Sequence, residues 1–153
     1  MVIGHLHIKN ATGIKGEEIA VKSLTDKGFT ILERNWKLGP KEVDIIAADK
    51  TTVVFAEVKC RTSMFAGSPE ECVTPEKKRN MLFAANAYMK IHHEERVARF
   101  DIIGVLLDPA TGDLLELTHL ESAFTAHIRS IGMYSYSGQN KWHKKSYRRQ
   151  HGF

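Results

Sequence analysis

The stretch TTVVFAEVKCR, residues 51–61, decides the fold, because it is typical of a buried β-strand and nevertheless carries charges. Val53 to Ala56 form an uninterrupted apolar run, as in strands at the centre of a sheet. Glu57 and Lys59 follow at once, and burying such charges costs several kcal/mol unless each has a partner. The stretch therefore predicts a central sheet and a site where these charges are used.

The preceding segments predict a helix, a strand and a hairpin. Residues 13–29 carry a helical apolar stripe that ends near Gly28, a residue typical of helix C-caps. Residues 29–37 favour a strand through their first half. KEVDIIAA, residues 41–48, is a second β-rich run, and a short turn joins it to the strand that follows.

The second half of the chain predicts another helix and two returning strands. Thr74 and Pro75 suit the N-cap and the first position of a helix. Residues 99–107 are a strongly apolar strand, residues 114–120 pair back with it, and residues 121–131 predict a short final helix. The chain is therefore expected to be a single α/β domain with a central mixed β-sheet flanked by helices.

Basic residues are concentrated at the C-terminal end. The chain has 22 Lys and Arg against 18 Asp and Glu, and no acid follows Glu121. We expect residues 1–132 to form the α/β domain and residues 133–153 to form a flexible, basic tail that contains aromatic residues. Such a tail suits nucleic acid, and a solubilising end is the alternative. Its predicted nucleic-acid-binding residues are Lys141, Lys144, Lys145, Arg148 and Arg149.

Composition also bears on the cellular setting. No run of about 18 apolar residues is present, so no membrane span and no membrane partner are expected. The two cysteines are too few for a disulfide framework and lack the spacing of zinc ligands. We therefore expect a cytoplasmic protein with free thiols.

The hairpin brings a second acid to Glu57. If a four-residue turn pairs Ala48 with Val53, Asp44 falls opposite Glu57 on the same face. Two carboxylates this close repel each other, and Mg²⁺ or Mn²⁺ between them would relieve the repulsion. A slip of one residue would turn Asp44 to the other face. The alternative is that Glu57 and Lys59 form a structural ion pair or part of a solvated surface.

Lys77 and Lys78 stand in the first turn of the second predicted helix, where the helix dipole disfavours cations. Two interpretations remain open for them. They either bind DNA phosphates or belong to a solvated basic turn.

The combined motifs resemble the YraN-like predicted endonucleases, a family of the PD-(D/E)xK nuclease superfamily that is similar to Holliday-junction resolvases. The resemblance extends from about residue 13 to residue 107. It implies a restriction-endonuclease-like fold and a metal-dependent endonuclease that hydrolyses phosphodiester bonds in DNA, with branched or junction DNA as a candidate substrate. The motifs are a Gly-Glu helix start, an RN pair, EVDIIA (residues 42–47), VFAEVKCR (residues 54–61) and RFDII (residues 99–103).

The resemblance also implies roles for individual residues. Asp44 and Glu57 would bind Mg²⁺ or Mn²⁺. Lys59 would orient or help deprotonate the attacking water and stabilise the transition state. Glu17, on the first helix, matches the acidic residue that completes such sites, and Arg61 would meet a phosphate.

Two positions depart from the family pattern. Lys41 stands where the family usually has Gly, and Val43 replaces the Pro of the superfamily motif. The first departure leaves open the role of Glu42, which falls in an acidic position just before the Asp. Resolvase-like enzymes make two symmetric cuts with two sites, so the resemblance also implies a homodimer.

Two other functions are compatible with the same residues. One is a non-catalytic nucleic-acid-binding or accessory protein on a nuclease-like fold, with RNA as well as DNA among its ligands. The other is a structural α/β protein in which the charges form a buried ion network. Metal binding by Asp44 and Glu57 would favour the enzyme.

Overall fold

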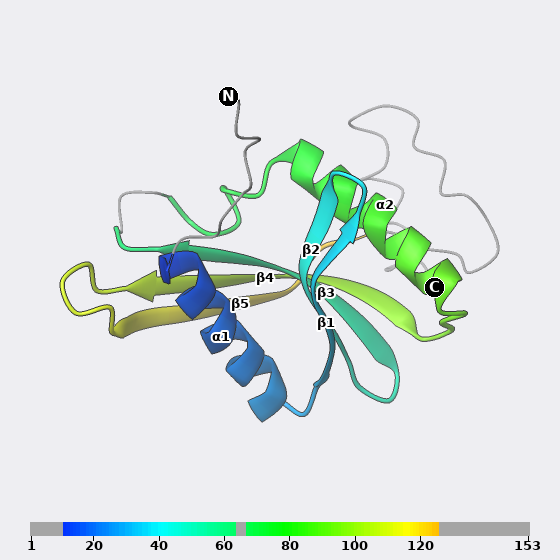
Figure 1. Ribbon diagram of the computed structural model, residues 1–153, viewed down its shortest axis with the longest axis horizontal. Helices are drawn as coiled ribbons and strands as arrows, with labels where there is room; N and C mark the ends of the chain where they lie inside the picture. Colours follow the sequence, from blue (N-terminus) through cyan, green and yellow to red (C-terminus); the bar gives the residue numbers. More distant parts are fainter. Residues whose placement is uncertain (1–10, 64–66, 126–153) are drawn as a thin grey trace, which may run out of the picture.

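The computed structural model describes residues 11–63 and 67–125 and shows a five-stranded sheet with one helix on each face (Figure 1). The strand order is β1-β2-β3-β4-β5; β3 and β4 run parallel and the other neighbours antiparallel. The predicted α/β fold with a central mixed sheet is confirmed and is consistent with a restriction-endonuclease-like architecture. The elements are α1 (Ala11–Asp26), β1 (Thr30–Leu38), β2 (Lys41–Ala48), β3 (Thr52–Arg61), α2 (Pro75–Ile91), β4 (Val97–Leu107) and β5 (Leu114–Phe124).

Helix α1 ends at the glycine that the sequence indicates. Gly28 has a φ of 93°, a conformation that L side chains rarely adopt. The N–H groups of Gly28 and Phe29 donate to the carbonyls of Thr25 and Leu24 at 2.9 and 3.0 Å, which is the Schellman pattern of helix termination. Ala20 and Leu24 are fully buried and pack α1 against one face of the sheet.

Helix α2 connects the parallel strands β3 and β4 and covers the other face of the sheet. Its start is capped as predicted: Pro75 is the first residue, and the Thr74 hydroxyl accepts the N–H of Lys77 at 3.1 Å. Among the described residues, no helix is long and apolar enough to cross a membrane. The buried residues of α2 are Met81, Leu82, Ala84, Ala85, Tyr88 and Met89.

The predicted helix over residues 121–131 is wrong at its start, since β5 continues to Phe124. Phe124 pairs with Phe100 of β4 and stacks on its ring, with the two centroids 5.0 Å apart. The N–H of Ser122 donates to the Asp101 carboxylate at 3.1 Å. These contacts with β4 outweigh a local preference for helix, which is a weak effect.

Strand β1 is also longer than predicted. It extends through Leu38 because its second half pairs with β2, with Trp36 opposite Val43 and Leu38 opposite Lys41. Residues 126–132 of the expected domain and the expected tail, residues 133–153, lie outside the described part of the chain.

The sheet opens between β2 and β3. Their last backbone pair is Ile45 with Ala56, whereas β3 continues to pair with β4 as far as Arg61. Figure 1 shows β2 running away from the C-terminal half of β3 beyond that point. The predicted site lies at this end of the ladder, where Asp44 and Glu57 remain buried.

Candidate functional site

Asp44 and Glu57 lie where the β2–β3 ladder ends. Ala48 pairs with Val53 as predicted, and this register places Asp44 opposite Glu57, one step beyond the last backbone pair. The Asp44 carboxylate accepts the N–H of Val58 at 2.9 Å, which ties it to β3. Asp44 is 7% exposed and Glu57 4%. The structure therefore brings together the two carboxylates that the sequence predicts as metal ligands.

Two lysines from different elements flank Glu57. The ammonium of Lys59, on β3, lies 3.2 Å from Oε1, and the ammonium of Lys77, on α2, lies 3.2 Å from Oε2. Lys77 also donates to the main-chain carbonyl of Glu42 at 3.2 Å. Oε2 is nevertheless buried without a directed hydrogen bond, so its contact with Lys77 is an attraction between charges. The sequence left open whether Lys77 binds DNA phosphates or belongs to a solvated basic turn, and neither interpretation includes this contact.

The negative charge of ionised Glu57 is only partly compensated by its neighbours. Burial raises its pKa to about 7, and the neighbouring charge of Asp44 adds to the rise. The cations of Lys77 and Lys59 lower the pKa and only partly offset the rise. A further positive charge at the site would stabilise the ionised form of Glu57.

The residues present fit a hard divalent cation. Two adjacent carboxylates, one with a buried oxygen that lacks a hydrogen bond, suit Mg²⁺ or Mn²⁺. No group of three or more His, Cys, Asp or Glu side chains that could hold a metal occurs within residues 11–63 and 67–125. Mg²⁺ commonly uses one or two carboxylates and keeps several waters, so Asp44 and Glu57 suffice for such an ion.

Glu17 approaches the same region from the opposite helix. Gly16 packs so closely on β3 that a Cβ there would lie 2.5 Å from the Cβ of Cys60, which lets α1 come near the strand. Glu17 is buried, and the side-chain amide of Asn35 donates to it at 3.3 Å. The β1–β2 register places Asn35 opposite Asp44. Asn35 therefore links Glu17 to the position on β1 that faces Asp44.

Asn35 was missed as a site residue, although a signal was available. Asn is unfavourable inside a strand, and here it has a φ of 51° in the middle of β1. When a polar residue with such a backbone conformation interrupts a strand beside a predicted site, that residue should be considered part of the site.

The other predicted residues have local partners. The Arg61 guanidinium donates to the carbonyl of Gly67 and, at 3.1 Å, to that of Ser68, which fastens the loop after β3. The Lys78 ammonium lies 5.6 Å from the centre of the Phe124 ring. The predicted tail residues Lys141, Lys144, Lys145, Arg148 and Arg149 lie outside the described residues.

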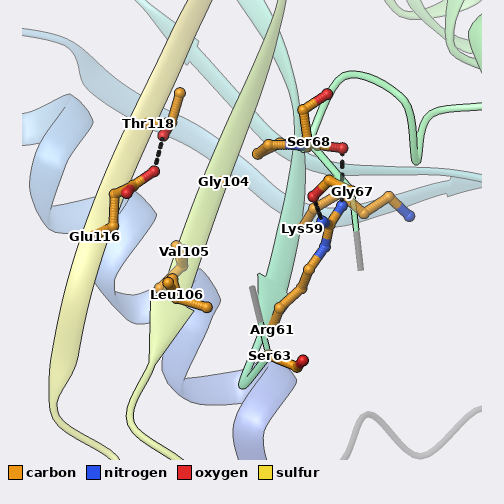
Figure 2. Close-up of a pocket in the computed structure, with 11 residues that line it drawn as sticks. Lys59, Arg61, Ser63, Gly67, Ser68, Gly104, Val105, Leu106, Glu116 and Thr118 are labelled. Atoms are coloured by element: carbon orange, nitrogen blue, oxygen red, sulfur yellow. Dashed lines mark hydrogen bonds between the residues drawn. The ribbon is translucent and has the colours of Figure 1, made fainter. Parts of the chain in front are cut away.

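A hollow of about 320 Å³ adjoins Lys59 (Figure 2). Figure 2 shows Lys59 and Arg61 on one side of it and Thr118 and Glu116, from β5, on the other. Its volume is that of a small ligand site. The remaining lining residues are Ser63, Gly67, Ser68, Pro69, Gly104, Val105 and Leu106.

Comparison with known proteins identifies the family. Residues 16–105, which include both carboxylates and both lysines of the site, match the family described as "Uncharacterised protein family UPF0102". A UPF0102 protein of Chlorobium phaeobacteroides (strain BS1) is 40% identical over 121 residues, covering 76% of this chain and 96% of that protein. Those of Chlorobaculum parvum and Porphyromonas gingivalis are 41% identical over 123 residues (78% and 95%) and 39% over 115 (75% and 84%). The chain therefore belongs to the UPF0102 family, the YraN family that its motifs resemble.

Proposed function

We propose that this protein is a metal-dependent endonuclease that hydrolyses phosphodiester bonds in DNA, with branched or junction DNA among its substrates. The observation that carries the proposal is Glu57, a buried carboxylate with a raised pKa and an oxygen that lacks a hydrogen bond. Asp44 stands beside it, and Lys59 lies 3.2 Å from it. Buried polar groups with a purely structural role are normally fully hydrogen-bonded, so this arrangement favours a ligand-binding role.

In this proposal Asp44 and Glu57 hold Mg²⁺ or Mn²⁺, which when bound supplies an activated water and offsets negative charge on the phosphate. The side chain of Lys59 is 32% exposed, so its ammonium reaches the open side of the site. There Lys59 orients the attacking water and stabilises the charge that develops on the phosphate oxygens. Glu17, which accepts a hydrogen bond from the Asn35 amide, completes the site from helix α1.

The hollow beside Lys59 supports a nucleic-acid substrate, because it offers room for a nucleotide next to the proposed reaction centre. In the proposal Arg61, Lys78 and the basic residues after 133 attract the phosphate backbone. Two symmetric cuts in a junction need two sites, so the proposal includes a homodimer.

A second candidate is a nucleic-acid-binding or accessory protein that does not cut. Lys59 and Lys77 already place two cations on Glu57, as in a structural ion network. This observation favours the second candidate, and metal-dependent cleavage decides between the two.

The test is cleavage of labelled duplex, single-stranded and four-way-junction DNA, and of matched RNA, with Mg²⁺, Mn²⁺ or EDTA. We expect the wild type to cut DNA only with metal. Asp44→Asn and Glu57→Gln should cut at background rates, and Lys59→Met should be about a hundredfold slower.

Glu18→Gln is the matched control, because Glu18 is an exposed carboxylate next to Glu17 that pairs with Arg34 at 2.7 Å. It should cut like the wild type. Binding of DNA without cutting under all conditions would refute the nuclease and leave the accessory protein. Cutting that survives in both Asp44→Asn and Glu57→Gln would place the active site elsewhere.

A further inference from the structure

The start of helix α2 holds Lys77 in the site. The Thr74 hydroxyl accepts the main-chain N–H of Lys77 at 3.1 Å and fixes the first turn of the helix. From there the Lys77 side chain reaches back to the Glu42 carbonyl and to Glu57, each at 3.2 Å. Lys78, the next residue, instead lies over the ring of Phe124. Of these two adjacent lysines, only Lys77 is directed at the carboxylate pair.

The attraction of the carboxylates explains why a cation is kept at this position. The first turn of a helix disfavours positive charge, and the Lys77 side chain is also partly buried, at 28% exposed. Glu57 and the neighbouring Asp44 supply the negative charge that offsets this. Displacement of this ammonium gives up its ion pair with Oε2 and its hydrogen bond to the Glu42 carbonyl, and the larger charge of a divalent ion has to offset both losses.

We propose that the Lys77 ammonium supplies the positive charge beside Glu57 while no metal is bound. When the divalent ion binds, it displaces Lys77 from Glu57. The inference rests on the metal site of the proposed function. An ion on Oε2 and an ammonium 3.2 Å from the same oxygen would be two cations within a few ångströms, which repel strongly in a buried site. The flexible stem of a lysine lets its ammonium move into solvent. Lys77 and the metal therefore compete for Glu57.

The test is Mn²⁺ binding to the full chain without DNA, measured by calorimetry and by the paramagnetic resonance of free Mn²⁺. The measurement is made at about pH 8, above the Glu57 pKa of about 7. Lys77→Met and Lys77→Gln remove the charge, and the Gln amide can still donate to the Glu42 carbonyl and support folding. Lys77→Arg keeps the charge. Lys78→Met is the matched control, because it removes the same charge one residue away.

Lys77→Met and Lys77→Gln should bind Mn²⁺ about tenfold more tightly than the wild type, and Lys77→Arg and Lys78→Met within about twofold of it. Equal affinities for the Lys77→Met and Lys78→Met proteins would overturn the inference, as would a failure of all the proteins to bind Mn²⁺. A crystal structure with Mn²⁺ on Glu57 and Lys77 still 3.2 Å from Oε2 would also overturn it.

The outcome of the Mn²⁺-binding experiment can be distinguished from the outcome of the cleavage assay. Competition between Mn²⁺ and Lys77 in a protein that cuts no DNA would support the inference and refute the enzyme. DNA cleavage together with an unchanged Mn²⁺ affinity in both neutral Lys77 variants would support the enzyme and refute the inference.

Discussion

Glu57 and Asp101 are buried carboxylates on neighbouring parallel strands, and their surroundings differ. Asp101 is fully buried and fully bonded: Arg99 donates to both oxygens at 2.9 and 2.7 Å, and Ser122 N–H donates at 3.1 Å. The Nε2 atom of His119 lies 2.7 Å from the same carboxylate. Glu57 has two lysines near it and one oxygen without a hydrogen bond.

The two environments have opposite consequences for ionisation. Burial opposes the charge of Asp101, but hydrogen bonds from His119 and Arg99 outweigh burial and lower its pKa. At Glu57 burial dominates, and the pKa rises to about 7. We therefore expect the ionised Asp101 to stabilise the fold and the ionised Glu57 to destabilise it. The comparison teaches that burial of a carboxylate does not indicate function unless its hydrogen bonds are incomplete.

The largest effect is expected from Asp101→Asn. The substitution removes the fully buried partner of Arg99 and leaves it with the exposed Glu121 at 3.7 Å, and breaking a buried ion pair costs about 3–5 kcal/mol of unfolding free energy. Urea denaturation at neutral pH measures the loss. Asp113→Asn, on the exposed turn before β5, is the control and should change stability by less than about 0.5 kcal/mol.

The loss should depend on pH in a defined direction. The pKa of Asp101 is lowered in the folded state, so its stabilising contribution is complete above the ordinary value of 3.8 and disappears as the pH falls below it. The difference in unfolding free energy between the wild type and Asp101→Asn should therefore disappear at such low pH. A gap of under about 1 kcal/mol at neutral pH would show that the cluster does not stabilise the fold.

Glu57→Gln should act in the opposite direction and increase stability. The change in pKa from 4.5 to about 7 corresponds to about 3 kcal/mol, and the lost attraction to Lys59 and Lys77 is already part of that value. The pKa is raised on folding, so the penalty is absent below pH 4.5, grows as the pH rises, and is complete above about 7. Unfolding free energies between these limits measure it. Lower stability of Glu57→Gln at about pH 8 would make Glu57 a structural ion-pair partner.

The smallest effect is expected from Asp44→Asn. The Asn side-chain oxygen can still accept the N–H of Val58, so stability should change by less than about 1 kcal/mol. Removal of the Asp44 charge should lower the pKa of Glu57 below its value of about 7, which an NMR titration of the Glu57 side chain would detect. A loss of about 3–5 kcal/mol would instead support the buried ion network as a structural device.

Much of the candidate site was predictable because it depends on local rules. Strand alternation and a four-residue turn were enough to place Asp44 opposite Glu57, since a hairpin pairs residues that are close in the chain. The same locality explains why Gly28 and Thr74 were correctly identified as the ends of their helices. The motifs shared with the YraN-like proteins also predicted the family to which the chain belongs.

The rest depended on contacts between residues that are far apart in sequence. Lys77 lies 20 positions after Glu57 and reaches it only because α2 crosses the sheet above β2 and β3. Phe124 continues a strand because Phe100 is its partner.

The β2–β3 hairpin, the end of α1, the start of α2 and the pair of acids were predictable from the sequence alone, because hydrogen bonding and side-chain alternation act over a few residues. Only the tertiary structure decided which carboxylate is satisfied and which is not. Asp101 obtains its hydrogen bonds partly from β5, and Glu57 obtains one of its two neighbouring cations from α2. Burial and charge at a site are sums over every element that packs against it, and no local pattern contains that sum.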